Sequence, residues 1–542
     1  MRPKLLPRLL LLLTVACVSA LLITPLVFSQ NAPVKVKLIA INDFHGNLEP
    51  ANLSFTMPNG DRVPAGGAEY LASYIDRLRK QNPNSLLVSA GDSVGATPLL
   101  SALFHDEPAI EALDLMGLAV NAVGNHEFDQ GFKELLRLQR GGCHPQDGCR
   151  GKDNYGGAKF QYLAANVIDR ATGKTILPAY QIRSFDGVKV AFIGMTLEGT
   201  PSLVSPQGIQ GLSFTDEAET VNKLVPELQK QGIKAIVVLI HEGGLPTGGY
   251  NECPSLSGAI VDIVQRTNPE VDLFVTGHTH QAYNCVIDGR RVTSAGAFGR
   301  LVTDIDLLLD RGTGEVRQIT AQNIVVKQDV PKRPDVTALI QKYKKIADPL
   351  INRSIGQITS DITRQANPAG ETPLGNLIAT AQLEATRSAG AVVAFMNPGG
   401  IRSDLTYAPS GQVSYGQAFA VQPFGNSLVT MDLTGAQIQE LLTQQFDNPV
   451  PGQNRILQVS SSFRYGYRDK QILFMEIDGK PVVPTQTYRV TVNSFLAGGG
   501  DKFTVLTQGK NRVIGVTDMS ALETYFRQNS PIAPPTLGRI QN

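Results

Sequence analysis

The sequence predicts an α/β fold in two parts, and three observations support this prediction. Short runs of β-branched and aliphatic residues alternate with helical patterns over residues 34–328, which is typical of mixed β-sheets covered by helices. An amphipathic pattern flanked by prolines then predicts a connecting helix within residues 329–352. Strands and helices continue over residues 353–542, which indicates a second, smaller α+β domain. A chain of 542 residues is also too long for one hydrophobic core.

Residues 1–29 have the pattern of an export signal. Arg2, Lys4 and Arg8 precede a nearly unbroken apolar stretch, and this order is typical of a cleaved leader. The stretch reaches about 20 residues, the length that spans a bilayer, so retention as an N-terminal anchor is the open alternative. We therefore expect an exported protein that is periplasmic, on the cell surface or secreted.

The composition narrows the range of functions. Charged residues make up 18% of the chain and hydrophobic residues 42%, as in an ordinary globular protein. A formal net charge of +1 gives no reason to expect a nucleic acid polymer as a partner. A small charged substrate remains compatible with this net charge, because its binding depends on the charged groups around the binding site and not on the total charge of the protein. Apart from an N-terminal anchor, no membrane contact is predicted, and the oligomeric state is left open.

Four cysteines follow the leader, an even number that favours disulfides over metal thiolates in an exported chain. Cys143 and Cys149 bracket a short Gly/Pro loop, so we expect them to pair with each other. Cys253 and Cys285 would then form a second bridge. That bridge would brace a region that contains three candidate metal ligands.

The elements of the first part follow from the spacing of apolar residues. Five runs are short enough to be strands buried on both faces: Val36–Ile41, Ser85–Ala90, Leu118–Val123, Ile233–Ile240 and Val271–Thr276. The helical patterns among them are Gly67–Gln81, Pro108–Met116, Gln130–Arg140 and Thr215–Gln231. Because no helical pattern separates the last runs, we expect antiparallel strands and a mixed sheet at Arg291–Ala297, Leu301–Leu309 and Val316–Val326.

The connecting helix and the second part are predicted in the same way. Asp335–Ala347 carries apolar residues at helical spacing between two prolines. The Pro-rich segment Pro531–Pro535 is expected to be a terminal tail. The predicted elements between them are helices near Pro373–Ser388 and Thr434–Gln445 and strands at Ala391–Phe395, Ser427–Leu433 and Thr487–Val492.

Each of the five buried runs ends in polar residues of the kinds that bind divalent metal ions, and ligands bind at the carboxyl ends of such strands. The candidate ligands are Asp43, His45, Asp92, Asn125, His241, His278 and His280. Taken singly, Asp92 would be read as a helix cap and His241 as a core histidine. Together with His126, however, these clusters contain five of the seven histidines of the chain. Structural roles such as a helix cap or a single core histidine do not explain why so many histidines follow strand ends.

The chemistry of the donors indicates which cofactors to expect. Oxygen and nitrogen ligands without cysteine suit Zn²⁺, Mn²⁺, Co²⁺ or Fe. Two divalent metal ions about 3.5 to 4 Å apart can clamp the attacking and leaving oxygens of an in-line displacement. We therefore expect two such ions, a water activated by both, and hydrolysis at phosphorus.

The motifs match a known family. Asp43-Phe44-His45, Gly91-Asp92, Gly124-Asn125-His126-Glu127, His241 and Gly277-His278-Thr279-His280 resemble the calcineurin-like metallophosphoesterases. With Phe128-Asp129 and the second domain, the chain resembles the secreted 5′-nucleotidase and UDP-sugar hydrolase family. The resemblance implies an N-terminal metallophosphoesterase sandwich joined by a helix to a C-terminal substrate-binding domain.

The resemblance also implies two ligand sets that share one carboxylate. They are Asp43, His45, Asp92 and His280 for one ion, and Asp92, Asn125, His241 and His278 for the other. His280 stands where the family carries Gln or Asn, which leaves the identity of the first ion open. His126, oriented by Asp129, would stabilise the transition state or the leaving group rather than bind metal.

In this family the second domain binds a small-molecule nucleotide. Phe424 and Phe495 lie in glycine-containing loops where they could stack on a base, although either alone would be read as a core residue. Arg402 follows a glycine-rich turn, where it either pairs with phosphate or is solvated. The substrate residues that the resemblance implies are Arg364, Asn397, Gly400, Arg402, Phe424, Asn426, Phe495 and Asp501.

Three functional hypotheses follow. The first is an exported dimetal phosphohydrolase that removes phosphate from nucleoside 5′-monophosphates and also hydrolyses nucleotide diphosphates or UDP-sugars. The second is a 2′,3′-cyclic-nucleotide 2′-phosphodiesterase with 3′-nucleotidase activity; Asp129 favours the first, because relatives of the second kind carry Asn there. The third is a catalytically silent ligand-binding surface protein, with thiosulfate-ester hydrolysis as a more distant alternative.

Overall fold

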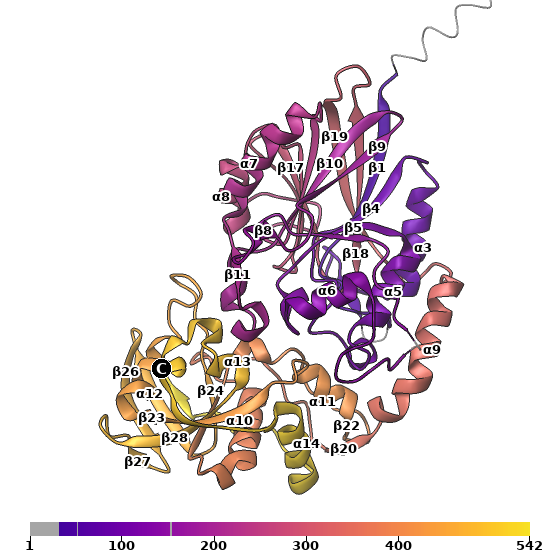
Figure 1. Ribbon diagram of the computed structural model, residues 1–542. Helices are drawn as coiled ribbons and strands as arrows, with labels where there is room; N and C mark the ends of the chain where they lie inside the picture. The colour runs from indigo at the N-terminus through magenta and orange to yellow at the C-terminus, as the bar shows by residue number, and fades with distance from the viewer. Residues whose placement is uncertain (1–31, 51–52, 152–153) are drawn as a thin grey trace, which may run out of the picture.

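The computed structural model describes residues 32–50, 53–151 and 154–542. The predicted export signal lies outside the described residues. Figure 1 shows an N-terminal unit above a smaller C-terminal unit, with one long helix running between them along the right-hand side. Within the described residues, no helix combines the length and the apolar character that a membrane crossing needs.

Two six-stranded mixed sheets form the N-terminal unit, which confirms the predicted α/β class. The first has the order β19 (Val316–Val325), β18 (Leu301–Leu309), β1 (Val34–Ile41), β4 (Ser85–Ser89), β5 (Leu118–Ala122), β6 (Gln161–Leu163). The second has the order β16 (Ala282–Ile287), β17 (Arg290–Ala295), β15 (Leu273–Thr276), β12 (Ala235–Ile240), β10 (Val188–Met195), β9 (Tyr180–Phe185). The last three predicted runs do not form one sheet, because β17 pairs in parallel with β15 while β18 and β19 pair antiparallel in the other sheet.

The two sheets pack face to face around a core of small branched side chains. Val36, Val88, Val120, Val237 and Val275 all belong to this core and are at most 1% exposed. Burying such a side chain contributes about 1.5 to 3 kcal/mol. The outer faces are covered by α3 (Ala68–Arg79), α5 (Glu107–Met116) and α6 (Phe132–Arg140) on the first sheet, and by α7 (Glu217–Lys230) and α8 (Ala259–Arg266) on the second.

The directions of the parallel strands determine where the candidate ligands lie. β1, β4 and β5 are parallel neighbours in one sheet, and β12 and β15 are parallel neighbours in the other. Their carboxyl ends meet at one edge of the sandwich, so the five loops that follow them converge.

The predicted connecting helix is α9 (Pro334–Ile351), which runs two residues past Pro349. Val336, Ile340 and Tyr343 are buried against the N-terminal unit, whereas Leu339 is only partly buried. The helix contacts α3, α4 (Leu99–Ala102) and α5 of that unit and α11 (Tyr415–Val421) of the C-terminal unit. It therefore joins the two units by packing as well as by chain connection.

The C-terminal unit has a five-stranded sheet of order β24-β21-β28-β23-β29. Its strands are β24 (Gln458–Val459), β21 (Val393–Met396), β28 (Thr487–Asn493), β23 (Ser427–Thr434) and β29 (Lys510–Thr517), and its main helices are α10 (Pro373–Thr386), α12 (Gly435–Thr443) and α14 (Asp518–Asn529). The expected terminal tail is bound to this unit instead: Ile532 pairs with Ile358, and β30 (Ile540–Gln541) pairs with β25 (Phe463–Arg468).

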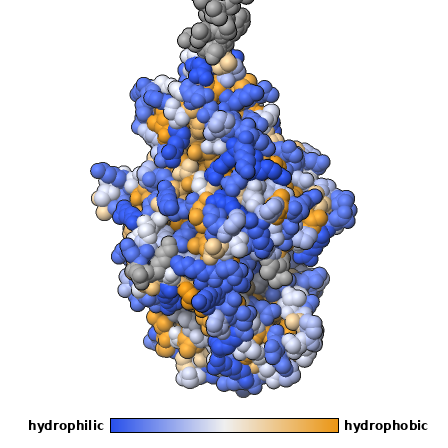
Figure 2. All heavy atoms as spheres, turned by 90° about the vertical axis from the view of Figure 1, so that its right-hand side faces the viewer, coloured by the Kyte–Doolittle hydropathy of each residue, from blue (hydrophilic) through white to orange (hydrophobic). Residues whose placement is uncertain are grey.

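Both predicted disulfides are present. The Cα atoms are 4.7 Å apart in Cys143–Cys149 and 5.2 Å apart in Cys253–Cys285. The second bridge ties the loop after β12 to β16, next to the convergent loops. On the face shown in Figure 2, hydrophobic residues are scattered among hydrophilic ones.

Candidate active site

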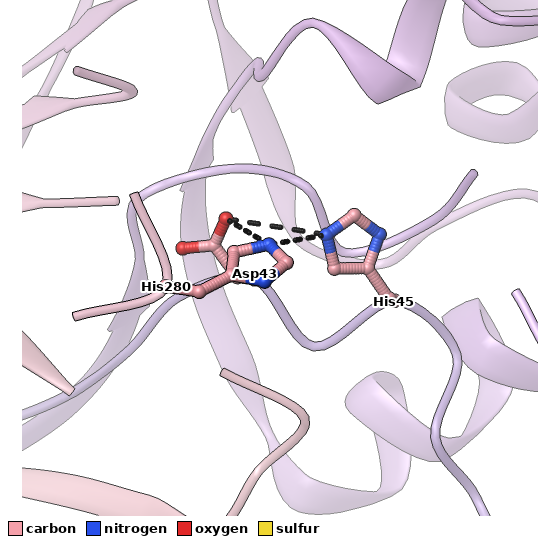
Figure 3. Close-up of side chains that lie close together, drawn as sticks. All are labelled: Asp43, His45 and His280. Atoms are coloured by element: carbon pink, nitrogen blue, oxygen red, sulfur yellow. Dashed lines mark hydrogen bonds and ion pairs between the residues drawn. The ribbon is translucent and has the colours of Figure 1, made fainter. Parts of the chain in front are cut away.

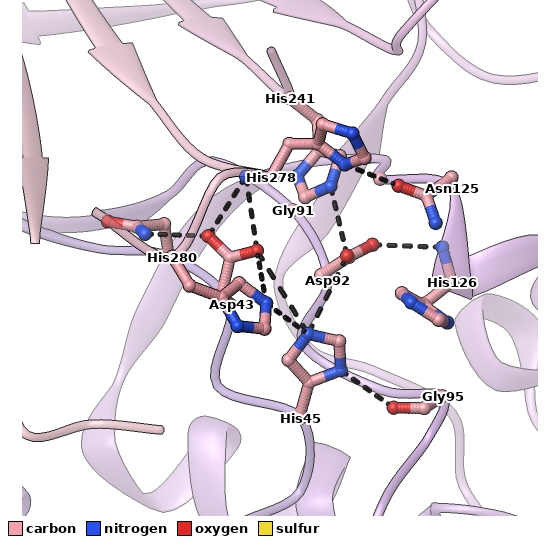
Figure 4. A network of polar contacts seen from close by, with 12 residues as sticks. Asp43, His45, Gly91, Asp92, Gly95, Asn125, His126, His241, His278 and His280 are labelled. Carbon is pink, nitrogen blue, oxygen red and sulfur yellow. Dashed lines mark hydrogen bonds and ion pairs between the residues drawn. The ribbon is translucent and has the colours of Figure 1, made fainter. Parts of the chain in front are cut away.

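The loops after β1, β4, β5, β12 and β15 bring all seven candidate ligands into one buried cluster (Figure 4). Close packing of these loops requires two glycines. A Cβ atom at Gly124 would lie 2.1 Å from Asp92 Oδ1, and one at Gly91 would lie 2.8 Å from His241 Nδ1. The glycines in the Gly91-Asp92 and Gly124-Asn125 motifs therefore allow the ligand loops to approach each other.

One half of the cluster consists of Asp43, His45 and His280 (Figure 3). The Nε2 atoms of His45 and His280 are 3.2 Å apart, and His280 Nε2 lies 3.4 Å from Asp43 Oδ1. Asp43 is fully buried, and its carboxylate accepts hydrogen bonds from the backbone N–H of His278 at 3.1 Å. Two imidazole nitrogens and a carboxylate thus face one point.

The other half contains Asp92, Asn125, His241 and His278. His241 Nε2 lies 3.0 Å from Asp92 Oδ2, and the same oxygen is 3.6 Å from His45 Nε2. Asp92 therefore stands between the two halves, where a carboxylate shared by two ions would stand. The Nδ1 atom of His278 and the Oδ1 atom of Asn125 are 3.0 Å apart.

Backbone carbonyls orient two of the imidazoles. His45 Nδ1–H donates to Gly95 O and His241 Nδ1–H donates to Ala90 O, both at 2.8 Å. Each ring then directs Nε2 into the cluster, as metal-bound histidines do. His241 Nε2 is buried, and its neighbour is the carboxylate of Asp92, whose Oδ2 lies 3.0 Å away. A ring nitrogen that faces buried carboxylates in this way fits a divalent cation.

The pKa values in the cluster agree with that fit. Burial lowers the pKa of His45 to about 3 and that of His278 to about 4, so both rings are neutral, as ligands must be. Burial also opposes protonation of His241, but the charge of Asp92 outweighs it and raises the pKa of His241 to about 10. The negative charge of Asp92 thus favours a positive charge at His241 Nε2, where the donor set would hold a cation.

Glu127 supports the cluster, although we assigned it no role from the sequence. Its buried carboxylate accepts hydrogen bonds from the backbone N–H groups of Asp92 at 3.0 Å, Ser93 at 2.8 Å and Gly124 at 2.7 Å. It thereby fastens the loop after β4 to the loop after β5. Its position inside the Gly124-Asn125-His126-Glu127 motif was a signal that could have identified it.

His126 lies at the edge of the cluster and is paired with Asp129. His126 Nδ1 lies 2.8 Å from Asp129 Oδ2, and the backbone N–H of His126 donates to Asp92 Oδ1 at 2.9 Å. Burial lowers the pKa of His126, but Asp129 and Asp92 together raise it above the usual value. The ring also lies nearly parallel to that of Phe424, with centroids 6.0 Å apart.

A cavity of about 260 Å³ separates the cluster from the C-terminal unit. One wall is formed by Asn125, His126, Asp129 and His278 of the N-terminal unit. The opposite wall contains seven of the eight predicted substrate residues: Asn397, Gly400, Arg402, Phe424, Asn426, Phe495 and Asp501. The structure thus brings together residues from distant parts of the sequence.

The C-terminal wall of the cavity contains a network around Asp501. Asn397 Nδ2 donates to Asp501 Oδ2 at 2.8 Å, and Arg455 Nη1 donates to Asp501 Oδ1. Phe495 packs on a glycine, since a Cβ atom at Gly500 would lie 2.5 Å from its ring. We did not single out Arg455 from the sequence, because it follows no motif.

Arg364 is the predicted substrate residue that the structure does not bring into the cavity. Its backbone N–H donates to Asp404 Oδ1 at 2.7 Å, its Nε lies 3.3 Å from the same oxygen, and its Nη1 donates to Ile401 O at 3.2 Å. These contacts hold the exposed side chain in a neighbouring groove that Arg402 also lines. A substrate role for Arg364 stays a prediction.

This cluster and the two-unit fold are typical of metal-dependent phosphoesterases that carry a second domain. Comparison with known proteins agrees: the calcineurin-like phosphoesterase family matches residues 36–282, and the 5′-nucleotidase C-terminal domain matches residues 354–508. The chain belongs to the calcineurin-like phosphoesterases that carry a 5′-nucleotidase C-terminal domain, a family of phosphoric ester hydrolases. Membership in this family implies divalent metal ions.

Individual relatives cover the chain almost completely. It is 34% identical to endonuclease YhcR of Bacillus subtilis over 94% of the chain and 41% of that protein. It is 36% identical to cell wall protein Lmo0130 of Listeria monocytogenes over 87% of the chain and 64% of that protein. The chain thus spans less than two thirds of each of these relatives. A crystal structure of a 5′-nucleotidase precursor from Thermus thermophilus matches with a TM-score of 0.76 and 27% identity, over 94% of the chain and 99% of that structure.

Proposed function

We propose that the protein is an exported dimetal phosphohydrolase that releases phosphate from nucleoside 5′-monophosphates, with nucleotide diphosphates and UDP-sugars as further substrates. One observation carries the proposal. A single cavity is lined both by metal-ligand residues of the cluster and by two aromatic rings, Phe424 and Phe495. One small molecule in this cavity can therefore contact the metal-ligand residues and the aromatic rings at the same time.

The proposed roles follow from the contacts. Two divalent ions, when bound by the seven ligands, would supply the positive charge and the acidified water that hydrolysis at phosphorus needs. His126, held by Asp129, lines the cavity beside the cluster and is the group proposed to act on the leaving 5′-oxygen. As the P–O5′ bond breaks and a water oxygen bonds to phosphorus, an imidazolium at His126 offsets the negative charge that develops on the leaving 5′-oxygen and gives its proton to that leaving oxygen.

Arg402 is the proposed phosphate ligand of the C-terminal unit. Its guanidinium lies 5.8 Å over the ring of Phe424 and lines the cavity. Among the described residues, no carboxylate forms an ion pair with it. An unpaired guanidinium can bind two phosphate oxygens through its planar fork.

Export is supported by residues 1–29, by the two disulfides and by the relative described as a cell wall protein. We infer a periplasmic, cell-surface or secreted location. Whether the leader is cleaved can be checked by N-terminal sequencing of the protein purified from its native host.

A substrate panel tests the activity. The purified protein is assayed with AMP, 3′-AMP and 2′,3′-cyclic AMP at one Mn²⁺ concentration, before and after EDTA treatment and metal add-back. Fastest release of phosphate from AMP, lost with EDTA and restored by metal, supports the proposal. Preference for the cyclic substrate would favour the phosphodiesterase, and two bound metals without turnover of any ester would favour a silent binding protein.

A further inference from the structure

Two histidines of the chain lie outside the proposed catalytic cluster, and the fold brings these two together. The sequence contains seven histidines, of which five belong to the cluster described above. The other two are His105 and His144. Their rings lie face to face, with centroids 3.7 Å apart and planes 8° from parallel. Two carboxylate side chains lie beside the rings, so the group has the residue types of a metal site.

Three segments supply the side chains of this group, which we call the second cluster: His105, Glu134, His144 and Asp147. His105 lies in the turn between α4 and α5, Glu134 lies in α6, and the other two lie in the loop that follows α6. The Cys143–Cys149 disulfide closes that loop, and Gly148 N–H donates to His144 O at 2.9 Å within it. The loop therefore keeps His144 and Asp147 close to each other.

The distances in the second cluster are close to those in the catalytic cluster. His105 Nε2 lies 2.9 Å from Asp147 Oδ2, and His144 Nδ1 lies 3.7 Å from the same oxygen. In the catalytic cluster, Asp92 Oδ2 lies 3.0 Å from one imidazole Nε2 and 3.6 Å from a second. Each cluster thus places two imidazole nitrogens around one carboxylate oxygen.

Glu134 adds a second carboxylate. One of its oxygens and one ring nitrogen each of His105 and His144 lie within 4.8 Å of one another. Arg137 also binds this carboxylate, with Nε 3.0 Å from Oε1 and 2.9 Å from Oε2, and Nη2 2.7 Å from Oε1. Each carboxylate oxygen can accept two hydrogen bonds, so Oε2 keeps one acceptor position. Two imidazoles and two carboxylates supply the four protein donors of a closed tetrahedral zinc site.

The charged groups around the rings favour a cation. Arg137 forms ion pairs with Glu107 and Glu134, and Arg150 forms one with Asp147 Oδ1 at 3.0 Å, which leaves Asp147 Oδ2 to face the histidines. Three carboxylates thus share two guanidinium groups, and one net negative charge remains when all are ionised.

Both imidazoles can present a nitrogen without a proton. Burial and the neighbouring ring of His144 lower the pKa of His105, so that ring is neutral, as a ligand must be. Asp147 N–H donates to His144 Nδ1 at 3.2 Å, so this nitrogen has a lone pair, and a bound ion takes the place of the long hydrogen bond. The side chains of His105 and His144 are 18% and 17% exposed and that of Asp147 is 34% exposed, so an ion can enter beside Asp147.

We propose that the second cluster binds one Zn²⁺ ion through His105 Nε2, His144 Nδ1 and the carboxylates of Asp147 and Glu134. Zinc binds imidazole and carboxylate donors at about 2.1 Å, so two donors of one ion are at most about 4.2 Å apart, and small side-chain rotations bring these four within that range. The ion ties the disulfide-closed loop to α6 and to the turn before α5. The site is separate from the two ions proposed for catalysis, and its occupancy does not depend on the nucleotidase function.

The test counts zinc in the wild type and in three variants. Each full-length protein is dialysed against buffered free Zn²⁺, and zinc per chain is measured by plasma mass spectrometry. His144→Ala and His105→Asn should each hold one Zn²⁺ fewer than the wild type. Asparagine is chosen at His105 because the backbone there has φ 53°, which asparagine tolerates. Glu219→Gln removes an exposed carboxylate from α7 and should leave the count unchanged.

Two further measurements locate the ion. Zinc should raise Tm of the wild type more than that of His144→Ala, because the additional ion binds only the folded protein. Crystals of the zinc-loaded wild type should show an anomalous peak between His105, His144 and Asp147. Absence of that peak, or an equal zinc count in the wild type and both histidine variants, overturns the inference. If His144→Ala does not fold, the count in His105→Asn decides.

Discussion

Phe424→Ala removes one of the two rings proposed to hold the base. Stacking of a base on an aromatic ring contributes about 1 to 3 kcal/mol. Since 1.4 kcal/mol corresponds to a factor of ten, the KM for AMP should rise about 5- to 150-fold. Phe424 also lies against His126, so we expect a smaller fall in kcat in addition.

The assay separates these two effects by using a substrate without a base. Steady-state phosphate release is measured from AMP and from ribose 5-phosphate with the same metal-loaded protein. Ribose 5-phosphate cannot stack, so the mutation should change its kcat/KM by no more than a factor of about three. Phe424→Tyr keeps the ring and serves as the matched control, with KM values close to those of the wild type.

The result that refutes this reasoning is an equal loss for both substrates. Phe424 would then support His126 and the phosphate end of the cavity, without reading the base. Metal content is measured in parallel, because Phe424 is not a ligand and the variant should bind as much metal as the wild type. A variant that loses metal would show instead that the cluster depends on this ring.

Three further perturbations follow from the structure. Asp92→Asn keeps the acceptor for the His126 N–H but removes the shared charge, so turnover should fall on the order of 1000-fold or more, and near-normal turnover would exclude the shared-ligand role. Replacing Cys253 and Cys285 by serine removes a bridge between residues 32 positions apart in the sequence and so releases a constraint on the unfolded chain. The free energy of unfolding, measured in urea, should fall by about 3 to 4 kcal/mol, and a loss below about 1 kcal/mol would contradict a stabilising role for this bridge. Burial raises the pKa of Asp272 to about 7 from 3.8, so its stabilisation of the fold is present at low pH and lost as the pH rises through about 7. Asp272→Asn should therefore raise Tm at pH 8 more than at pH 5, and an equal shift at both pH values would refute this.

The strands that carry the site were the most predictable part of the fold. A strand buried on both faces is a continuous apolar run, and this signal needs no knowledge of its neighbours. The run Ile233–Ile240 differs from β12 by two residues at its start, and Val271–Thr276 differs from β15 by the same amount. Ends of elements shift in this way because their hydrogen bonds depend on flanking turns.

The division into two sheets was not predictable from the same signals. Arg291–Ala297 has the pattern of a strand, but nothing local shows that it pairs in parallel with β15 while Leu301–Leu309 crosses to the other sheet. Pairing of this kind depends on which faces the inter-sheet core buries, and that core joins residues from Val34 to Leu309. Side chains hundreds of residues apart in the sequence decide it together.

The candidate site shows the same contrast. Asp43 and His280 could be chosen because each lies at the end of a recognisable strand or in a recognisable motif. Arg455 could not, since it lies in a loop before β24 and only the fold brings it to Asp501, 46 residues further on. Arg364 shows the opposite case: its residue type suits phosphate, but Asp404 holds it outside the cavity, and its substrate role stays a prediction.

The backbone of the cluster indicates that the ligand loops hold one another in place. Five of the seven candidate ligands have positive φ, a conformation that side chains other than glycine rarely adopt: Asp43 47°, His45 46°, Asp92 49°, His278 69° and His280 56°. Such positions cost of order 1 to 3 kcal/mol each and persist only where neighbouring structure imposes them. Here the loops impose them on one another, since Asp43 N–H donates to Gly91 O and His45 N–H donates to Asp92 O, both at 3.0 Å. Because these bonds use backbone atoms, a variant that changes only a ligand side chain should keep the loops in place, and its loss of activity then reports on the ligand itself.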